Sequence, residues 1–314
     1  MSLARREVKA ITLALLSEVQ DQLLRGDVGK GMDRLIRGLK EIRSMLVLDE
    51  WMELANTEIL VHPLASIIHQ FPVTQHAYRR PRGYQGDADL LDYIYGRKPL
   101  PLQLDPLARA IYEHCIQTSV PQSVRDRCRL LSEKIDTTVT SSADEVQLLS
   151  VACGHLRELQ DTAAMTQPER ARIFAYDQDP MALEVVKRQY PAKNVETICG
   201  SVAALIRSGS RRTNFHLVYA AGLYDYLSQD LAAKLTRQLF AMVRAGGNLL
   251  IANFAPEHGE IGYMEAFMRW NLVYRTPEQL SDVTALIDRS MIASQRLFDE
   301  GNGIIFFLEV TKAP

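Results

Sequence analysis

The sequence predicts an α/β protein in which a helical N-terminal region precedes a doubly wound, mainly parallel sheet. Two observations carry this prediction. Through most of the first 140 residues, apolar side chains recur at intervals of three and four, which is the spacing of amphipathic helices. After residue 144, short apolar runs alternate with helical stretches, which is typical of consecutive strand–helix–strand units and a parallel sheet.

The composition is that of a globular protein with a sizeable core. The chain has 314 residues, of which 47% are hydrophobic and 24% charged, so it is not a disordered, collagenous or disulfide-scaffold chain. The formal net charge of −2 gives no global positive field that would recruit nucleic acid or an anionic membrane. We therefore expect a small-molecule substrate as the partner, and the oligomeric state is left open.

Cysteine usage and the N-terminus indicate the compartment. The four cysteines Cys115, Cys128, Cys153 and Cys199 lie far apart without a CxxC pair, so we expect reduced core thiols and no metal site. The first twenty residues mix Arg5, Arg6, Lys9 and acidic residues with a short apolar stretch, which fits neither a signal peptide nor a membrane span. A cytoplasmic protein is the expectation.

The N-terminal helical region is expected to cover residues 1–140 and to act as a cap. Helical periodicity runs from Val8 to Leu60, with a break at Gly26-Asp27, and returns from about Pro106 to Ile135. Between these helices, the segment YRRPRGYQGDADLLDYIYG (78–96) is rich in turn-forming, aromatic and basic residues, which makes it a candidate functional loop.

The region 141–314 is expected to form a Rossmann-like domain. Its predicted strands are VQLLSVAC, ARIFAYD, NVETICG, FHLVYAAG, GNLLIANF and a closing GIIFFLEVTK, and helical stretches such as PMALEVVKRQY separate several of them. Right-handed crossovers between successive strands then give a doubly wound sheet. In such sheets, ligands bind at the carboxyl ends of the strands.

The loops after the first two strands point to an adenosine-containing ligand. Gly154 permits close backbone approach after the first strand, but the positions of Ala152, Gly154 and Leu156 hold one glycine only, so the GxGxxG cradle for a dinucleotide pyrophosphate is missing. Asp177 ends the second strand about twenty residues later, where an acid can accept hydrogen bonds from both ribose hydroxyls. Alternatively, Asp177 caps the helix that begins near Pro180.

Several segments together resemble a known family. SVACGHLRE, YDQDPMAL, CGSV, LVYAAGLYDYL, RAGGNLLIANF and GYMEAFMRWNLVYR resemble, in order and spacing, the class I S-adenosylmethionine-dependent methyltransferases over about residues 144–314. With PRGYQGDADLLDYIYG, the resemblance extends to a bacterial subgroup associated with 3-hydroxypalmitate methyl ester biosynthesis. The chain is also similar to bacterial azetidine-2-carboxylate synthases, which share the fold and this kind of helical cap.

The resemblance implies a cofactor site for S-adenosylmethionine. In it, Asp177 holds the ribose and Gln178 packs beside the adenine. Because this sequence departs from the family pattern, we expect Arg82 in the N-terminal loop to supply the grip on the aminoacyl carboxylate. The other implied cofactor residues are Ala152, Cys153, Gly154 and His155 at the methionine portion, Gly200, Ser201 and Val202 at the adenine edge, and Ala221. Ser150 and Ala152 depart from the family pattern, which carries an acid and a glycine there, and Ser201 stands where an acid often meets the adenine amine.

Tyrosines are the candidate catalytic residues, because an aromatic face attracts a sulfonium cation. We expect Tyr84, Tyr176 and Tyr224 in this role. Expected substrate contacts are Tyr78, Arg82, Asn253 and Tyr274. Packing in the core is the competing interpretation of the tyrosines. His62, His69 and His76 recur at intervals of seven, but Pro63 and Pro72 interrupt the register, so no metal site is expected there.

Three functions fit these residues. The first is methyl transfer to a small molecule in secondary metabolism or signalling, with a carboxylate acceptor needing no base because it is already anionic. The second is cyclisation of S-adenosylmethionine to azetidine-2-carboxylate with release of methylthioadenosine. The third is a binding or regulatory module without turnover. The sequence alone leaves these alternatives open.

Overall fold

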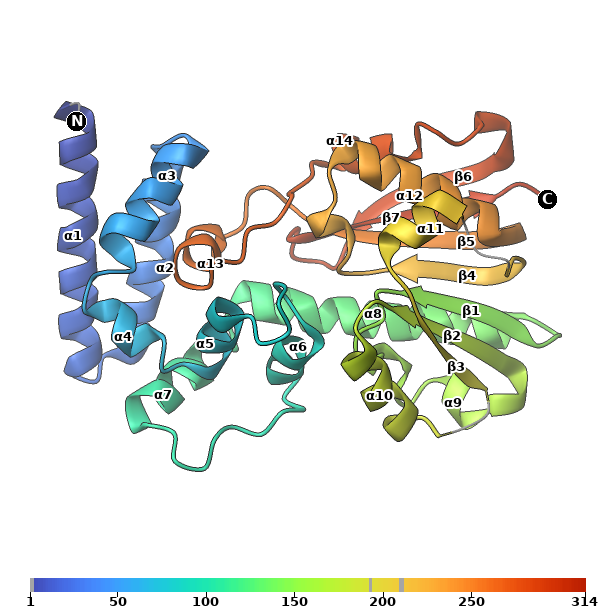
Figure 1. Ribbon diagram of the computed structural model, residues 1–314, viewed down its shortest axis with the longest axis horizontal. Coiled ribbons are helices and arrows are strands. Elements are labelled where there is room, and N and C mark those ends of the chain that lie inside the picture. Colours follow the sequence, from blue (N-terminus) through green and yellow to red (C-terminus); the bar gives the residue numbers. More distant parts are fainter. Residues whose placement is uncertain (1–2, 192–193, 209–211) are drawn as a thin grey trace. The chain divides into compact units, whose positions relative to one another are not determined.

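The chain forms two compact units in a computed structural model that describes residues 3–191, 194–208 and 212–314 (Figure 1). A helical unit comprises Met1–Arg125 and Glu257–Asn271, and an α/β unit comprises Asp126–Pro256 and Leu272–Pro314. This division differs from the expected boundary at residue 140, because the boundary falls inside helix α8 (Ser119–Ser141) and a later segment returns to the helical unit.

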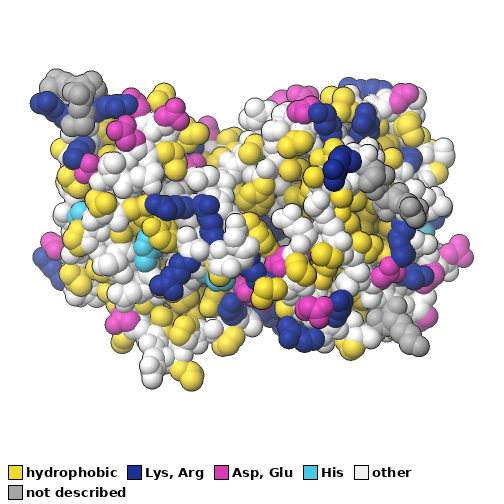
Figure 2. All heavy atoms as spheres, in the orientation of Figure 1, with side chains coloured by type: hydrophobic (Ala, Val, Ile, Leu, Met, Phe, Trp, Pro, Cys, Tyr) yellow, Lys and Arg dark blue, Asp and Glu magenta, His cyan; other side chains and the backbone are white. Residues whose placement is uncertain are grey.

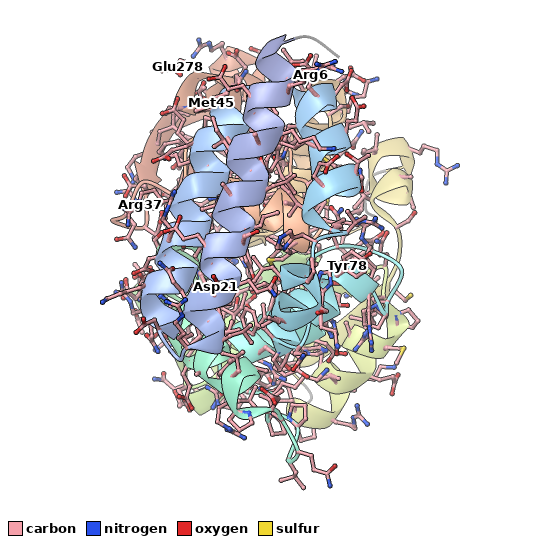
Figure 3. The ribbon with its side chains drawn as sticks, turned by 90° about the vertical axis from the view of Figure 1, so that its left-hand side faces the viewer. Arg6, Asp21, Arg37, Met45, Tyr78 and Glu278 are labelled. Carbon is pink, nitrogen blue, oxygen red and sulfur yellow. The ribbon has the colours of Figure 1, made fainter. Side chains whose placement is uncertain are left out.

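The helical unit is built on two long helices that lie side by side (Figure 3). Glycines of the second of these helices, α2 (Val28–Ser44), permit the close packing, since a Cβ at Gly38 would lie 2.5 Å from Leu15 and one at Gly31 would lie 2.9 Å from Leu23. The elements before α8 are α1 (Leu3–Leu24), α2 (Val28–Ser44), α3 (Leu48–Leu54), a π-helical turn (Ala55–Ile59), α4 (Leu64–Ile68), α5 (Pro72–Arg79), α6 (Ala88–Ile94) and α7 (Pro106–Cys115).

Helix α13 (Ile261–Phe267) completes this unit although it follows the fifth strand of the other unit. All seven of its residues are buried. Gly262 lets it touch the backbone of α2, because a Cβ there would lie 2.6 Å from the carbonyl oxygen of Leu39. Arg43 of α2 donates two hydrogen bonds to Glu265, at 2.6 and 3.0 Å, and Glu265 is only 3% exposed. The returning segment is therefore part of the core of the helical unit.

The α/β unit contains a seven-stranded sheet in the order β3-β2-β1-β4-β5-β7-β6. The first five strands are mutually parallel, and β7 runs antiparallel to both of its neighbours. The strands are β1 (Val146–Val151), β2 (Ala171–Asp177), β3 (Val195–Cys199), β4 (Phe215–Ala220), β5 (Val243–Phe254), β6 (Ile292–Asp299) and β7 (Ile305–Lys312). The predicted doubly wound, mainly parallel sheet is thus confirmed, and β6 is an edge strand that the sequence pattern did not predict.

Helices and short turns connect the strands. They are η2 (Arg157–Leu159), α9 (Ala163–Thr166), η3 (Pro168–Arg170), α10 (Pro180–Gln189), α11 (Val202–Ser208), η4 (Tyr224–Tyr226), α12 (Gln229–Met242), α14 (Pro277–Ser281), η5 (Asp282–Thr284) and η6 (Arg289–Met291). Leu235 and Leu239 of α12 lie in one buried cluster with Leu149 of β1, Val218 of β4 and Ile251 of β5. This burial fixes α12 against the sheet, because each such side chain gains about 1.5–3 kcal/mol on leaving water.

The topology defines where a ligand should bind. From β1, the chain moves to β2 and β3 on one side, and then crosses back to β4 and β5 on the other side. The switch in direction therefore lies between β1 and β4, and ligands of open α/β sheets occupy the crevice at the carboxyl ends of such strands.

The surface mixes charges of both signs. On the face shown in Figure 2, basic and acidic side chains are interspersed with apolar ones. In the described part of the chain, none of the helices has the length and apolar character that crossing a membrane requires.

Candidate functional site

Three alternate residues of the turn after β1 have left-handed backbone conformations. Ala152, Gly154 and Leu156 have φ angles of 54°, 53° and 53°, which lie in the left-handed region. Ala152 therefore adopts a conformation that glycine adopts more easily. An alanine in place of the glycine of the family pattern is thus compatible with this turn. The left-handed conformation costs a non-glycine residue about 1–2 kcal/mol, and such strain is concentrated at functional sites.

Asp177 lies at the end of β2 and is oriented by backbone donors. Its Oδ2 accepts a hydrogen bond from the N–H of Gly154 at 2.8 Å, and its Oδ1 accepts one from the N–H of Asp179 at 2.8 Å. Burial raises the pKa of Asp177, and these backbone hydrogen bonds act in the opposite direction. A carboxylate has about four acceptor positions, so the oriented group can still accept bonds from two hydroxyls.

The cap of the next helix is a different residue. Asp179 is the N-cap of α10, and its Oδ1 accepts the N–H of Met181 at 2.8 Å. The alternative interpretation of Asp177 as the helix cap is therefore wrong. Asp177 instead joins the turn after β1 to the end of β2.

Hydrogen bonds connect the ends of β1, β2 and β3. The N–H of Cys153 donates to the carbonyl of Tyr176 at 3.2 Å, and the N–H of Gly200 donates to the carbonyl of Asp177 at 2.9 Å. The hydroxyl of Tyr176 donates to the carbonyl of Ser201 at 2.9 Å. Gly200 is needed because a Cβ there would clash with the Tyr176 hydroxyl. The structure thus brings together these residues, which the sequence assigned to one site.

The remaining expected cofactor residues lie around these strand ends. Ala152, Gln178 and Ser201 are exposed, Val202 and Ala221 are half-buried, and His155 is buried. Tyr176 is 8% exposed, and burial raises its pKa. With its hydroxyl already donating to Ser201, Tyr176 is suited to form a wall of the site and not to act as a base.

Two expected site residues are instead held inside the α/β unit. Tyr224 is fully buried, and its hydroxyl is 2.9 Å from Oγ1 of Thr236. Asn253 is 1% exposed, and its amide donates to the carbonyls of Phe254 and Val273. These side chains stabilise the loop after β4 and the end of β5. We therefore leave both Tyr224 and Asn253 out of the proposed site.

The remaining expected site residues are divided between the two units. The helical unit contains Tyr78, Arg82 and Tyr84, and the α/β unit contains Tyr274 as well as Asp177. The Tyr78 ring lies 4.3 Å from the His69 ring and 4.8 Å from the guanidinium of Arg269. Tyr84 and Tyr274 are half-buried.

Arg82 is engaged in an ion pair. Its side chain is 8% exposed, and its Nη2 is 2.9 Å from the carboxylate of Asp89. The expected grip on the aminoacyl carboxylate therefore competes with Asp89.

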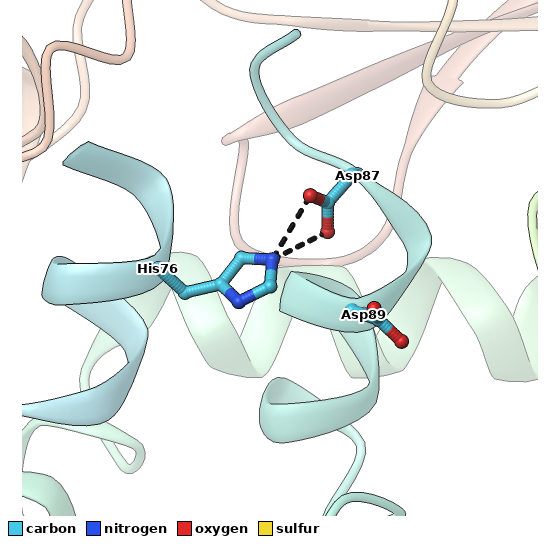
Figure 4. A group of neighbouring side chains, drawn as sticks. All are labelled: His76, Asp87 and Asp89. Atoms are coloured by element: carbon cyan, nitrogen blue, oxygen red, sulfur yellow. Dashed lines mark hydrogen bonds and ion pairs between the residues drawn. The ribbon is translucent and has the colours of Figure 1, made fainter. Parts of the chain in front are cut away.

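The partly buried His76 and the buried Asp87 form a pair at the base of the aromatic and basic loop (Figure 4). Nε2 of His76 lies 2.7 and 2.9 Å from the two carboxylate oxygens of Asp87, which also accepts the N–H of Leu90 as the N-cap of α6. Asp89 is close enough to share a metal ion with this pair. It is already paired with Arg82 and with Lys98 at 3.6 Å, so we interpret the cluster as an ion-pair network that ties α5 to α6.

Three buried charged residues near the ends of β1 and β4 were not found by sequence reasoning. They are Arg127 on α8, Glu158 on η2 and Asp225 on η4, which are 4%, 9% and 3% exposed. Charged residues are rarely buried without a partner. The signal that could have revealed these three residues is an acidic or basic residue at a position that the apolar pattern assigns to the core.

Glu158 is hydrogen-bonded across the switch point. Tyr219 of β4 donates to its Oε1 at 2.9 Å, and Tyr219 is directly paired with Ser150 of β1 in the sheet. Burial raises the pKa of Glu158, while hydrogen bonds from Tyr219 and Ser150 and the charge of Arg127 act in the opposite direction. A carboxylate therefore lies beside Ser150, the position where the family pattern has an acid.

Asp225 should make folding stability depend on pH. Burial raises its pKa from 3.8 to about 6, against the effects of the Phe254 N–H, Arg127 and Arg275. Because the folded state holds this proton more tightly, the contribution of Asp225 to stability falls by about 3 kcal/mol as pH rises from about 4 to about 6. Asp225→Asn keeps an acceptor for Phe254 but does not titrate. Denaturant unfolding should therefore show the variant gaining stability relative to the wild type over this range, and a constant difference would contradict the assignment.

Comparisons with known proteins bear on the fold. No model of a known protein family matches the chain, and no curated protein matches it. A solved structure described as a possible exported protein from Bordetella parapertussis is similar, with a TM-score of 0.63 and 17% identity over 92% of this chain and 97% of that one. Magnesium protoporphyrin IX methyltransferase (ChlM) from Synechocystis PCC 6803, with bound SAH, has a TM-score of 0.50 and 10% identity over 78% of this chain and 99% of that one. The chain therefore has a fold that is also found in a methyltransferase.

Proposed function

We propose that this chain is an enzyme that binds S-adenosylmethionine and transfers its methyl group to a small-molecule acceptor. The observation that carries the proposal is the carboxylate of Asp177, held by Gly154 and Asp179 where a ribose would lie. The shared fold and the SAH bound to the Synechocystis methyltransferase support it.

The residues of the α/β unit fit such a ligand. Asp177 would accept hydrogen bonds from the two ribose hydroxyls, and the exposed Gln178 and Ser201 would border the adenine. The sharp turn through Ala152 and Gly154 brings backbone close to the ligand without bulky side chains. When bound, S-adenosylmethionine supplies a methyl carbon already activated by a sulfonium, so the protein mainly has to position the acceptor and exclude water.

We propose a carboxylate as the acceptor, because a carboxylate is a nucleophile without a base. Two of the three candidate catalytic tyrosines have hydroxyls that are already engaged, so neither hydroxyl is placed to take a proton from an acceptor. Tyr176 donates to a backbone carbonyl, and Tyr224 is buried against Thr236.

Mass spectrometry of the products tests the proposal directly. The purified chain is incubated with S-adenosylmethionine and a set of carboxylic acids, and with S-adenosylmethionine alone. We expect S-adenosylhomocysteine and a methyl ester in the first incubation and neither in the second. Methylthioadenosine with an amino acid of the mass of azetidine-2-carboxylate would instead show cyclisation. Unchanged ligand in both incubations would contradict turnover, and no binding by calorimetry would contradict the whole proposal.

A further inference from the structure

A second cavity of the α/β unit has a basic lining. Its volume is about 330 Å³, and it is lined by the last turns of α8 and by the amino ends of β4 and β5. The lining includes Lys134, His216 and Arg244, and none of the described lining residues is acidic. Asp177 lies at the carboxyl end of a strand parallel to β4 and β5, so this cavity is at the opposite edge of the sheet. The volume is within the range of small-molecule sites.

A bulge in β5 lies opposite His216. Between two successive pairs of the β4–β5 ladder, β4 has the single residue His216, whereas β5 has residues 244–247, which are Arg-Ala-Gly-Gly. Gly246 has a φ of 70°, and a Cβ at Gly247 would lie 2.9 Å from the carbonyl oxygen of Phe215, so the bulge needs both glycines. Bulges redirect side chains and are frequent next to active sites. The first residue of this bulge is the arginine that lines the cavity.

The imidazole of His216 faces two donors, although a neutral imidazole has one acceptor nitrogen. Its Nδ1 accepts the N–H of Gln147 of β1 at 3.1 Å, and its Nε2 lies 2.6 Å from Nη1 of Arg244. Burial and the charge of Arg244 lower the pKa of His216, against the effect of Asp144, so the ring is neutral at pH 7. With Nδ1 as the acceptor, the proton is on Nε2. An N–H of the ring and an N–H of the guanidinium therefore meet without an acceptor for either.

Cations outnumber carboxylates at this cavity even when the nearby acids are counted. Lys134 forms an ion pair with Glu309, but Glu309 also pairs with Arg296 at 3.1 Å. The second acid is Asp144, which is exposed and acts on the histidine. Together with Arg244, three cations thus accompany two carboxylates, which is an excess of one positive charge. Because Glu309 keeps Arg296, Lys134 can turn to an anion without leaving a carboxylate unpaired.

We propose that this cavity binds the phosphate group of a small ligand, at a site separate from the one proposed for S-adenosylmethionine. The guanidinium fork of Arg244 binds two oxygens, Nε2 of His216 donates to a third, and Lys134 supplies a further positive charge. These donors come from three different elements, which suits a tetrahedral group whose oxygens point in several directions. A planar carboxylate would be satisfied by the guanidinium alone. The inference does not depend on methyl transfer.

Calorimetry of the full chain with inorganic phosphate tests this site. We expect saturable binding by the wild type, and Arg244→Met should weaken it at least about 10-fold, as expected for loss of a charge-assisted pair. Arg244 is exposed, so this variant should keep the wild-type melting temperature. Arg237→Met is the matched control, because Arg237 is an exposed arginine of α12 that does not line the cavity, and it should change the affinity less than about twofold.

The outcomes decide both the place and the class of the ligand. No saturable binding of phosphate by the wild type, or equal affinities of the wild type and Arg244→Met, would overturn the site. Equal weakening by Arg244→Met and Arg237→Met would show attraction to surface charge only, which also overturns it. Acetate at the same ionic strength should not compete with phosphate, and competition at equal concentration would contradict the phosphate class. Binding of S-adenosylhomocysteine by Arg244→Met should equal that of the wild type, since the two sites lie at opposite edges of the sheet.

Discussion

Asp177→Ala is expected to weaken S-adenosylmethionine binding by at least about 100-fold. Two ribose hydroxyls would lose a charged acceptor, and each such hydrogen bond contributes about 1.5–3 kcal/mol. The substitution also removes the acceptor for Gly154 and Asp179, so the turn after β1 would lose its connection to the end of β2. Calorimetry measures the affinity, and an affinity close to that of the wild type would remove the central assignment.

Asp179→Ala is the matched control for this experiment. It removes the N-cap of α10, which typically contributes about 1 kcal/mol to stability, but it leaves the Asp177 carboxylate in place. We expect a lower melting temperature with an affinity within a few-fold of the wild type. If both variants weaken binding equally, the effect comes from local unfolding and not from the ribose contact.

Deleting residues 1–125 is expected to abolish both turnover and solubility. The seven buried residues of α13 would remain in the chain without α2, which they pack against, and each large apolar side chain exposed costs about 1.5–3 kcal/mol. The expected result is aggregated protein with no S-adenosylhomocysteine formed, measured by the soluble fraction and by product analysis. A soluble, fully active truncated chain would show that the helical unit has no part in catalysis.

A second truncation separates solubility from catalysis. In it, residues 1–125 are deleted and residues 257–271 are replaced by a short Gly/Ser linker, so the whole helical unit is removed. This chain should stay soluble and should bind S-adenosylhomocysteine, because Asp177 and the turn after β1 both lie in the remaining unit. It should form no methylated product, since the helical region that is expected to act as a cap is absent.

The local signals in the sequence were strong enough to predict the sheet and part of the site. The strands were visible as apolar runs, and Asp177 was visible because an acid ends such a run after a single-glycine turn. The strand β6 was missed because all its side chains are exposed or half-buried, so Ile292–Asp299 carries no continuous apolar run.

These local signals could not predict contacts between distant parts of the chain. Nothing in the local pattern of GYMEAF shows that it packs on α2, because the pairing of Gly262 with Leu39 depends on two surfaces more than 200 residues apart. The position of a tyrosine in the sequence does not show whether its side chain packs in the core or lines a site, so Tyr224 could not be assigned correctly. Arg127 and Glu158 were passed over because their burial is produced by the fold and not by their neighbours in sequence.

The return of the chain to the helical unit also determines the order in which the protein can be completed during synthesis. Helix α2 is made early, but the residues of α13 that cover it leave the ribosome only after five strands of the other unit. Until then, part of the α2 surface lacks its partner, and contacts of such long sequence separation form slowly. Transiently exposed apolar surface of this kind promotes aggregation, so the nascent helices have to be protected until residue 271 has emerged.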